Sequence, residues 1–251
     1  MSSVTTLVFV HAHPDDEALL TAGTMARAAA EGNRVVLVVA TDGAAGLTSA
    51  AFQDGLAEHR RAEVEESARH LGVARVVHLG YADSGIDGTA ANGFASAPME
   101  DVVDRIAGVL AEEGADVVVG YDPSGGYGHP DHVRVHAAVR AAAARSGGRL
   151  RLFEATLPRE PIANAVRIAA ATRLTPAGFD PAEFDRAWTP RREITHRVDV
   201  RDYLDAKRAS LAAHASQAAA DDTTRTLAVL NRLPGPAFTL LLGTEYYVAV
   251  R

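Results

Sequence analysis

Short apolar runs and longer amphipathic runs alternate along the first half of the chain. Residues 7–10 and 34–40 are almost entirely apolar and rich in valine, as strands buried on both faces of a parallel sheet tend to be. Residues 18–30 and 58–71 have the composition of helices, and each run ends next to a glycine. The pattern therefore predicts a strand–helix–strand–helix succession from the N-terminus onward.

The same alternation continues through the next hundred residues. Strands are predicted at 75–79, 116–120 and 150–155, and helices at 99–112 and 130–145. Strands that alternate with helices form parallel sheets through right-handed crossovers. We therefore expect an α/β fold with a doubly wound, mostly parallel Rossmann-like sheet.

The last third of the chain departs from this rhythm. Residues 158–192 contain several prolines and mixed polarity, and we expect them to form a cap or lid. A helix at 200–215 and a terminal strand at 238–250 are predicted to complete the sheet. No repeat and no linker calls for a second domain, so residues 1–251 are expected to form a single domain with a small C-terminal cap region.

Composition and charge narrow the function classes. The chain has 251 residues, 47% of them apolar, which is enough for a sizeable core. Its charges are mixed, with a net charge of −7 and no basic run, so neither nucleic acid nor a membrane surface is expected as a partner. The first residues carry no basic segment ahead of a long apolar one, and we expect a cytoplasmic protein.

The absence of cysteine limits the chemistry further. Disulfides, thiolate metal sites and cysteine nucleophiles are excluded, because the chain contains no cysteine. Any metal ion would have to be held by His, Asp or Glu side chains.

Two copies of the tripeptide His-Pro-Asp are the most informative motifs. They occur in His13-Pro14-Asp15-Asp16-Glu17 and in His129-Pro130-Asp131-His132, each after a predicted strand and at the start of a predicted helix. The carboxyl ends of neighbouring parallel strands share one crevice, so ligands contributed by both segments can meet there. The pair predicts a metal-dependent hydrolase, which neither copy would indicate alone.

The first motif has two interpretations. Proline and acidic residues are common in the first turn of a helix, so Pro14 to Glu17 alone would indicate only an acidic helix start. His13 changes this balance, because it stands three residues before Asp16 and both side chains can point the same way. An imidazole and a carboxylate on one side make half of a zinc site, with Asp15 beside the ion but not bound to it.

The second motif can supply the missing ligand. His129 and His132 are also three residues apart at a predicted helix start, and one of them would complete a His-Asp-His triad. A triad leaves coordination positions open for water and substrate, which is typical of catalytic metal sites.

Together the motifs resemble the PIG-L / LmbE-like family of zinc-dependent N-deacetylases, through residues 12–17 and 128–132. That family includes the deacetylase of the mycothiol pathway and the related mycothiol-conjugate amidase. The resemblance covers nearly the whole chain in order, with shorter matches at Arg60 with Glu63, Leu71-Gly72-Val73, Asp83-Ser84-Gly85, Tyr127 and His214-Ala215-Ser216-Gln217.

The resemblance implies roles for the residues of the first motif and its partner. His13, Asp16 and His132 correspond to metal ligands, and Asp15 corresponds to the general base. The implied ion is Zn²⁺, with Fe²⁺ as an alternative.

The resemblance also implies roles around the ligands. His129 would act as general acid or oxyanion partner, oriented by Asp131, and Tyr127 would help to polarise the amide. Arg60 and Asp83 would hold sugar hydroxyls, although an exposed helix charge and a turn former describe them equally well. His214 would line the pocket or pack the C-terminal helix.

The function implied by the resemblance is removal of an N-acyl group, in the first instance N-acetyl, from an amino sugar or a related conjugate. The alternative within the family is amide hydrolysis of a mycothiol S-conjugate. The expected partner is thus a small N-acylated amino-sugar or thiol-conjugate substrate, and a homo-oligomer is compatible with the sequence. Residues 84–98 and 158–192 are expected to shape the pocket.

Two other classes of protein remain open. Two histidines and a carboxylate also form the facial triad of non-haem Fe(II) oxygenases, but those enzymes usually have an all-β barrel. A non-catalytic Rossmann-type binding module is disfavoured, because the first predicted strand leads into His-Ala-His-Pro and not into G-x-G-x-x-G.

A chelator experiment separates the hydrolase from the oxygenase. Treatment with a chelator is expected to abolish deacetylation, and Zn²⁺ is expected to restore it, because the water nucleophile depends on the ion. The assay measures released amine with and without oxygen. Strict dependence on oxygen would contradict the hydrolase interpretation.

Overall fold

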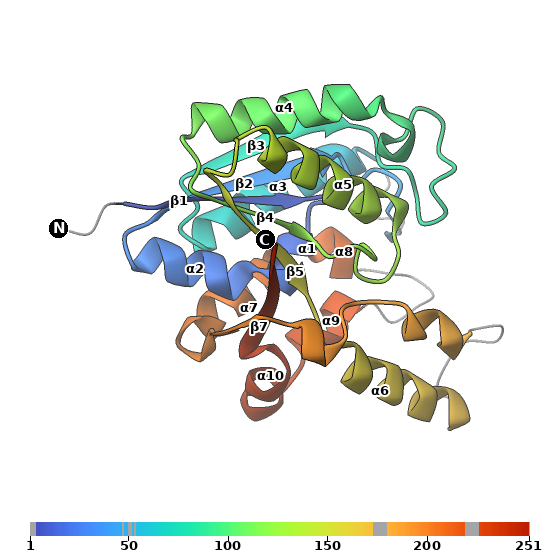
Figure 1. Cartoon of the computed structure of the whole chain (residues 1–251). Helices are drawn as coiled ribbons and strands as arrows, with labels where there is room; N and C mark the ends of the chain where they lie inside the picture. Colours follow the sequence, from blue (N-terminus) through green and yellow to red (C-terminus); the bar gives the residue numbers. More distant parts are fainter. Residues whose placement is uncertain are drawn as a thin grey trace.

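The computed structural model describes residues 4–46, 48–49, 52, 54–172, 180–218 and 226–250. Their core is a seven-stranded sheet in the order β3-β2-β1-β4-β5-β7-β6 (Figure 1). The strands are β1 (Thr6–His11), β2 (Arg34–Thr41), β3 (Arg75–Tyr81), β4 (Val117–Tyr121), β5 (Arg151–Thr156), β6 (His196–Asp199) and β7 (Thr244–Val250). The first five strands run parallel, whereas β7 is antiparallel to both β5 and β6. The predicted mostly parallel α/β sheet is confirmed.

Helices cover both faces of the sheet. On one face lie α4 (Met99–Glu112) and α5 (Pro130–Ala144), and on the other lie α2 (Ala22–Ala30) and α3 (Leu56–His70), with α7 (Leu204–Ala213) packed against them (Figure 1). The remaining helices are α1 (Asp16–Leu20), α6 (Arg159–Ala171), α8 (Ala215–Ala218), α9 (Thr226–Asn231) and α10 (Gly235–Leu242). Single 3-10 turns occur at Phe94–Ser96, Pro181–Asp185, Arg191–Glu193 and Arg201–Tyr203.

The apolar runs form the centre of this sandwich. In β2, Val36 and Val38 pack toward the layer of α4 and α5, whereas Val35 and Leu37 pack toward α2 and α3. Side chains alternate across a strand, so a strand buried on both faces must be apolar at every position. This requirement explains why the run at 34–40 is so uniform.

The strand order places the two motif loops side by side. β1 pairs with β2 on one side and with β4 on the other. The chain builds the sheet outward from β1 through β2 to β3, and then crosses back to continue on the other side of β1 with β4 and β5. Such a switch of direction opens a crevice at the carboxyl ends of the two strands. The loop after β1 carries the first His-Pro-Asp motif, and the loop after β4 carries the second.

Two predicted helices have different limits in the structure. The run at 18–30 is interrupted at Thr21, whose backbone (φ −135°, ψ −1°) is not helical and whose hydroxyl contacts His11 Nε2 at 2.8 Å. The helix predicted at 200–215 begins only at Leu204 and ends at Ala213. Thr21 at the first break and His214 at the end of α7 both form side-chain hydrogen bonds outside their own helix. Such polar residues often mark the end of a regular helical segment.

The prediction of a terminal strand at 238–250 was partly wrong. Residues Gly235–Leu242 form α10, and only Thr244–Val250 form β7. Pro236 favours the first turn of a helix, and a short apolar run such as 238–242 is equally compatible with helix and strand. The sequence also gave no indication of β6, which is short and mostly exposed.

The region predicted as a cap forms α6 and two 3-10 turns, and residues 173–179 of it lie outside the described residues. It is attached to the glycine-rich loop after β4, because the backbone N–H of Trp188 donates to Gly126 O at 2.8 Å. Arg159 secures the same segment by donating to Trp188 O at 2.6 Å. Its function as a lid stays a prediction.

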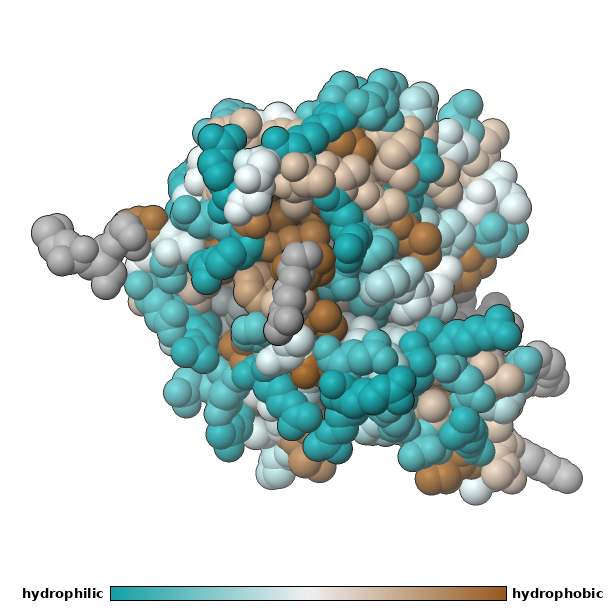
Figure 2. All heavy atoms as spheres, in the orientation of Figure 1, coloured by the Kyte–Doolittle hydropathy of each residue, from teal (hydrophilic) through white to brown (hydrophobic). Residues whose placement is uncertain are grey.

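The surface is predominantly polar on the face shown in Figure 2, where hydrophobic residues form separate patches. Within the described part of the chain, every helix is too short or too polar to cross a bilayer.

A buried ion pair joins α7 to β7. Lys207 Nζ lies 2.6 Å from Glu245 Oε1, and the side chains are only 1% and 2% exposed. Glu245 also accepts the backbone N–H groups of Gly23 and Thr24 at the start of α2, both at 2.8 Å. This carboxylate therefore ties α2 and α7 to β7.

Removing the charge of Glu245 is expected to destabilise the fold. Glu245→Gln leaves the Lys207 ammonium buried without a counter-charge, and the free energy of unfolding should fall by about 3 kcal/mol. Denaturant titration measures this change. The matched control is Glu31→Gln, which breaks an exposed pair with Arg27 and should change the value by less than about 0.5 kcal/mol. Equal effects in the two variants would contradict the account.

Candidate active site

The two motif loops converge at the carboxyl ends of β1 and β4. Pro130 occupies the first turn of α5, and His129 caps this helix because its Nδ1 accepts the backbone N–H of Asp131 at 3.2 Å. The helix start therefore fixes both His129 and His132, which lies one turn further on. In the first loop, the backbone N–H of His13 donates to Asp16 Oδ2 at 2.8 Å, which closes a tight turn before α1.

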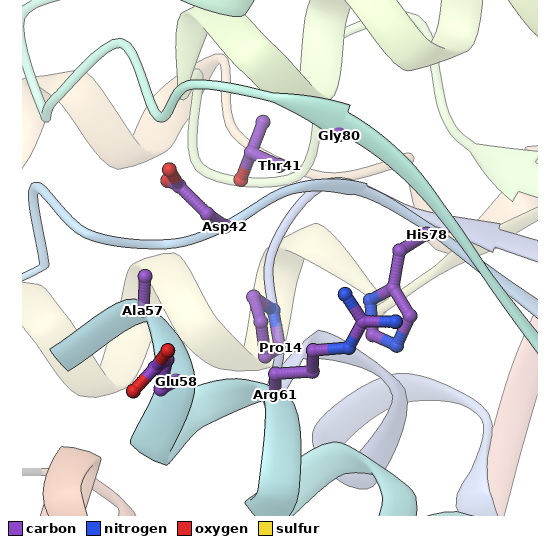
Figure 3. A pocket seen from close by; sticks show the side chains of 8 residues that line it. All are labelled: Pro14, Thr41, Asp42, Ala57, Glu58, Arg61, His78 and Gly80. Carbon is purple, nitrogen blue, oxygen red and sulfur yellow. The ribbon is translucent and has the colours of Figure 1, made fainter. Parts of the chain in front are cut away.

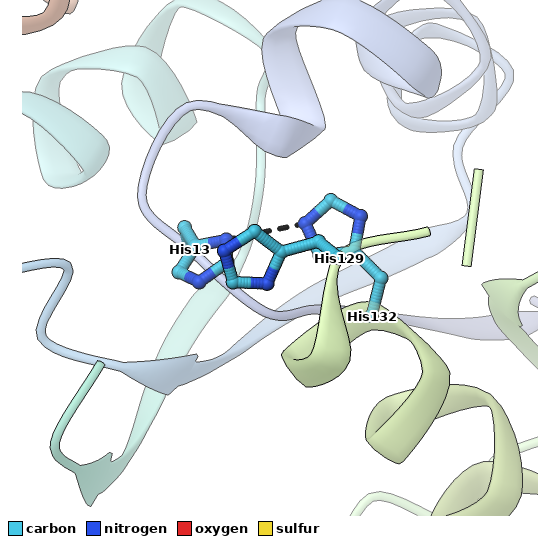
Figure 4. Close-up of side chains that lie close together, drawn as sticks. All are labelled: His13, His129 and His132. Atoms are coloured by element: carbon cyan, nitrogen blue, oxygen red, sulfur yellow. Dashed lines mark hydrogen bonds between the residues drawn. The ribbon is translucent and has the colours of Figure 1, made fainter. Parts of the chain in front are cut away.

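Three donor atoms from the two loops lie almost equally far apart. His13 Nδ1 is 3.2 Å from His132 Nε2, and Asp16 Oδ2 is 3.3 Å from each of these nitrogen atoms. All three side chains are less than a tenth exposed. Figure 4 shows His13 and His132 facing one another, with His129 alongside. In a tetrahedral site with bonds of about 2.0–2.1 Å, ligand atoms lie about 3.3 Å apart, so this spacing fits one ion.

Each of the two histidines is held by its other nitrogen. His13 Nε2 contacts Asp131 Oδ2 at 3.1 Å, and His132 Nδ1 lies 3.2 Å from the backbone oxygen of Gly125. Carboxylates and backbone carbonyls in this position fix the tautomer of metal-binding histidines, so that the inner nitrogen presents its lone pair. The arrangement thus has the outer contacts as well as the inner donors of a metal site.

Two wider groups of donors overlap this triad. Donor atoms of His13, His129 and His132 lie within 4.8 Å of one another, and so do donors of His13, Asp83, His129 and Asp131. In the second group, the carboxylates of Asp83 and Asp131 face Nε2 of His13, where a carboxylate serves as a hydrogen-bond acceptor. The equal spacing of His13, Asp16 and His132 makes these three donors the more suitable position for an ion.

Asp16 is kept ionised by its surroundings. Burial raises the pKa of this carboxyl group, but the neighbouring His132 and the hydrogen bond from His13 outweigh burial and hold the pKa well below its usual range. Tyr121 also donates its hydroxyl to Asp16 Oδ2 at 2.7 Å. A charged, oriented carboxylate is the form that binds a cation.

Asp15 stands next to the triad in a different environment. Its side chain is 19% exposed, and its Oδ1 lies 3.2 Å from Nη2 of Arg60. Burial raises the pKa of Asp15, although Arg60 acts in the opposite direction. A carboxylate with a raised pKa is better suited to accept a proton than Asp16 is.

His129 and Tyr127 contact the histidines of the triad with their rings. The rings of His129 and His13 are 4.5 Å apart at 74°, and Tyr127 meets His132 edge-on at 5.2 Å. Burial, together with the nearby His13 and His132, lowers the pKa of His129 to about 4. Burial raises the pKa of the Tyr127 hydroxyl, so both groups are neutral donors near pH 7.

Three of the predicted contacts differ in the structure. Arg60 is 2% exposed and donates to Gly43 O and Pro14 O, each at 2.6 Å, so it is not an exposed helix charge, and its contact with a sugar hydroxyl stays a prediction. His214 is fully buried and bonds to Glu17 Oε1 at 2.6 Å, so it does not line an open pocket. The side chains of Arg60 and His214 reach inward because α3 and the end of α7 both pack behind the first motif.

The third difference concerns Asp131. We expected its carboxylate to orient His129, but the carboxylate contacts His13 Nε2 and the backbone N–H of Ser84, each at 3.1 Å. The hydrogen bond from Asp131 to His129 comes from its backbone N–H instead. The Asp83 carboxylate lies near the same nitrogen of His13, at 3.5 Å, and accepts the backbone N–H of Gly85.

Sequence reasoning missed Tyr121 and Glu17 as parts of the site. Tyr121 is the last residue of β4, and its hydroxyl both donates to Asp16 and accepts the Ala12 N–H at 2.9 Å. The only signal was a polar aromatic residue at the carboxyl end of a strand that is otherwise apolar. Glu17 was assigned to an acidic helix start, although it is fully buried.

A separate small pocket lies beside the triad, between α3 and the edge of the sheet (Figure 3). Its volume is about 180 Å³, which is below the usual size of a ligand site. It is lined by Pro14, Thr41, Asp42, Ala57, Glu58, Arg61, His78 and Gly80. Since only Pro14 belongs to the motifs, we do not place the chemistry there.

A doubly wound sheet with a buried His/Asp cluster at its switch point suits a metal-dependent enzyme. The family model "PIG-L: GlcNAc-PI de-N-acetylase" matches residues 8–143 of this sequence. The 1D-myo-inositol 2-acetamido-2-deoxy-alpha-D-glucopyranoside deacetylase of Saccharomonospora viridis is 37% identical, covering 98% of this chain and 95% of the relative. The chain therefore belongs to the PIG-L family, and it is an N-deacetylase.

Solved structures agree on the fold. N,N'-diacetylchitobiose deacetylase from Pyrococcus horikoshii has a TM-score of 0.64 and 24% identity, covering 99% of this chain and 84% of that one. The 4-carboxy-2-hydroxymuconate hydratase GalB from Pseudomonas putida KT2440 is also similar, with a TM-score of 0.61, 17% identity and coverage of 99% and 97%. Because a deacetylase and a hydratase share the fold, it is the family match that carries the activity.

Removing the hydroxyl of Tyr121 should weaken ion binding. Tyr121→Phe deprives Asp16 of a donor and leaves the Ala12 N–H unpaired, and outer contacts of this kind are worth about 10–100-fold in metal affinity. Competition with a chelator measures the affinity. Tyr81→Phe is the control, since the Tyr81 hydroxyl has no hydrogen-bond partner in the described structure. Equal affinities in wild type and Tyr121→Phe would show that this hydroxyl does not support the site.

Proposed function

We propose that this protein hydrolyses the N-acetyl group of a glucosaminyl-inositol conjugate. The name of a relative matched over nearly its full length supports this substrate class, since the Saccharomonospora viridis protein is a deacetylase of an acetamido-glucopyranosyl inositol. The observation that carries the proposal is the equal spacing of three buried donors with a second carboxylate beside them. This arrangement suits attack of water on an amide.

The proposed ligands are His13, Asp16 and His132. Their donor atoms are 3.2–3.3 Å apart, as ligands of one tetrahedral ion would be. Two imidazoles and one carboxylate, in a chain without cysteine, suit Zn²⁺, and Fe²⁺ accepts the same donors. A bound ion supplies Lewis acidity, which makes water reactive toward an amide near neutral pH and polarises the carbonyl.

Asp15 is the proposed general base. It stands between the proposed ligands His13 and Asp16 but is not one of the three donors, and its carboxylate contacts Arg60. A carboxylate beside the ion and not bound to it can accept the proton of the attacking water. After attack, the same carboxyl group can pass this proton to the nitrogen of the leaving amine. Proton transfer by a positioned side chain contributes about 10²–10⁴-fold to a rate.

His129 and Tyr127 are proposed to stabilise the negative oxygen that forms from the substrate carbonyl. Because Nδ1 of His129 accepts the Asp131 N–H, the proton of the neutral ring lies on Nε2, from which it can be donated. The Tyr127 hydroxyl is the second donor, on a side chain that is 47% exposed and therefore accessible to substrate. Donors placed where charge develops are typically the largest contribution to such catalysis.

Asp83 is proposed to contact a sugar hydroxyl while it supports His13. It lies at the carboxyl end of β3, next to Asp131 and on the same side of the sheet as His129. We propose that residues 84–98 and 158–192 set the specificity for the part of the substrate beyond the acetylated sugar.

Two neighbouring substitutions test the assignment of roles. Asp15→Ala should keep the metal and lower kcat by about 10²–10⁴-fold, because only the proton acceptor is removed. Asp16→Ala should lose metal and activity together. The measurements are metal content of the purified variants and release of acetate from N-acetylglucosaminyl-inositol. Metal retained at the wild-type level in Asp16→Ala would remove this residue from the ligands.

A further inference from the structure

Asp15 has a backbone conformation that few residues other than glycine adopt. Its φ is 133° and its ψ is −22°, outside the regions that are comfortable for an L-amino acid. Such conformations are strained and persist only where the surroundings enforce them. The side chain of Asp15 is directed by this backbone, so whatever enforces the conformation also places the carboxylate.

A single peptide group is held from both ends at this point. The carbonyl of Pro14 accepts a hydrogen bond from Arg60 Nη2 at 2.6 Å, and the N–H of Asp15 donates to Glu17 Oε2 at 3.0 Å. Both groups belong to the peptide bond between residues 14 and 15, whose orientation determines φ of Asp15. Arg60 also lies 3.2 Å from the Asp15 carboxylate itself. The strained residue is thus fixed by two charged side chains.

Glu17 is in turn held by groups from two helical segments. Its Oε1 accepts a hydrogen bond from Ser67 Oγ in α3 at 2.6 Å. The same oxygen lies 2.6 Å from Nε2 of His214, which follows α7. All three side chains are completely buried. Since one oxygen of Glu17 is occupied by Ser67 and His214, the other is directed at Asp15. This network crosses from the C-terminal part of the chain to the first motif.

We propose that Glu17 and Arg60 are positioning residues that hold the peptide between Pro14 and Asp15, and that His214 orients Glu17 for this task. The inference rests on the proposed function of Asp15 as general base. It explains why a buried carboxylate stands directly after the ligand loop and why Arg60 and His214 are buried behind the first motif.

A purely structural role is the alternative, and Glu245 provides the comparison. Glu245 is likewise a buried carboxylate that accepts backbone N–H groups, but these belong to Gly23 and Thr24 in α2. A change at Glu245 should therefore affect stability without affecting the base. A change at Glu17 should affect the base beyond any loss of stability.

The experiment compares Glu17→Ala, Glu17→Gln and Glu245→Gln, each loaded with Zn²⁺ and assayed on N-acetylglucosaminyl-inositol. Glu17→Ala should lower kcat about 100-fold, the effect of a small misplacement of a catalytic group, with KM and metal content unchanged. Glu17→Gln should stay within about tenfold of wild type, because an amide oxygen can still accept the Asp15 N–H. Glu245→Gln should be less stable with an unchanged kcat.

A second variant applies if Glu17→Ala does not fold. Glu17→Asp keeps a carboxylate for Ser67 and His214 but is one methylene too short to reach the Asp15 N–H as well, so it should lose kcat like the alanine variant. A folded, metal-loaded Glu17→Ala or Glu17→Asp enzyme with wild-type kcat would overturn the inference. Loss of metal in these variants would also overturn it, since Glu17 would then support Asp16.

A double-mutant cycle separates this inference from the proposed function. If Glu17 acts through Asp15, Glu17→Ala should cause no further loss of kcat in an Asp15→Ala background. A full additional loss in that background would overturn the inference and leave Asp15 as the base. Wild-type turnover in Asp15→Ala alone would instead contradict the proposed function.

Discussion

The site depends on the parallel pairing of β1 with both β2 and β4. This pairing brings the carboxyl end of β1 next to that of β4, although the two loops are more than a hundred residues apart in sequence. Without it, His13 Nδ1 and His132 Nε2 could not lie 3.2 Å apart. The apolar strands that cause the pairing carry no chemistry, but they decide where the polar residues meet.

Much of the fold and the inner part of the site could be predicted from the sequence. Strands such as 34–40 are recognisable because burial on both faces leaves no polar position, and the two motifs stand where such strands end. α10 was mistaken for a strand because a short apolar run has no period of its own. The orientations of Asp131, Arg60 and His214 were unpredictable, since they depend on which buried partner each side chain reaches.

The surroundings of the triad give two adjacent carboxylates different properties. Asp16 faces two imidazoles and a tyrosine hydroxyl, which hold its charge, whereas Asp15 is turned away by a strained backbone and meets Arg60. The two residues are adjacent in the sequence, yet the Asp15 side chain is 19% exposed and the Asp16 side chain 9%, and their partners differ. Under the proposed function, cation binding and proton transfer fall to neighbouring residues that backbone geometry separates, and the helices behind the loop maintain this geometry.

X-ray absorption at the zinc edge of the loaded protein tests the central claim most directly. The account predicts a first coordination shell of two imidazole nitrogens and one carboxylate oxygen at about 2.0–2.1 Å, completed by water. The imidazole contribution should fall by half in His132→Ala. A shell without imidazole, or a spectrum that this substitution leaves unchanged, would contradict an ion held between the two motif loops.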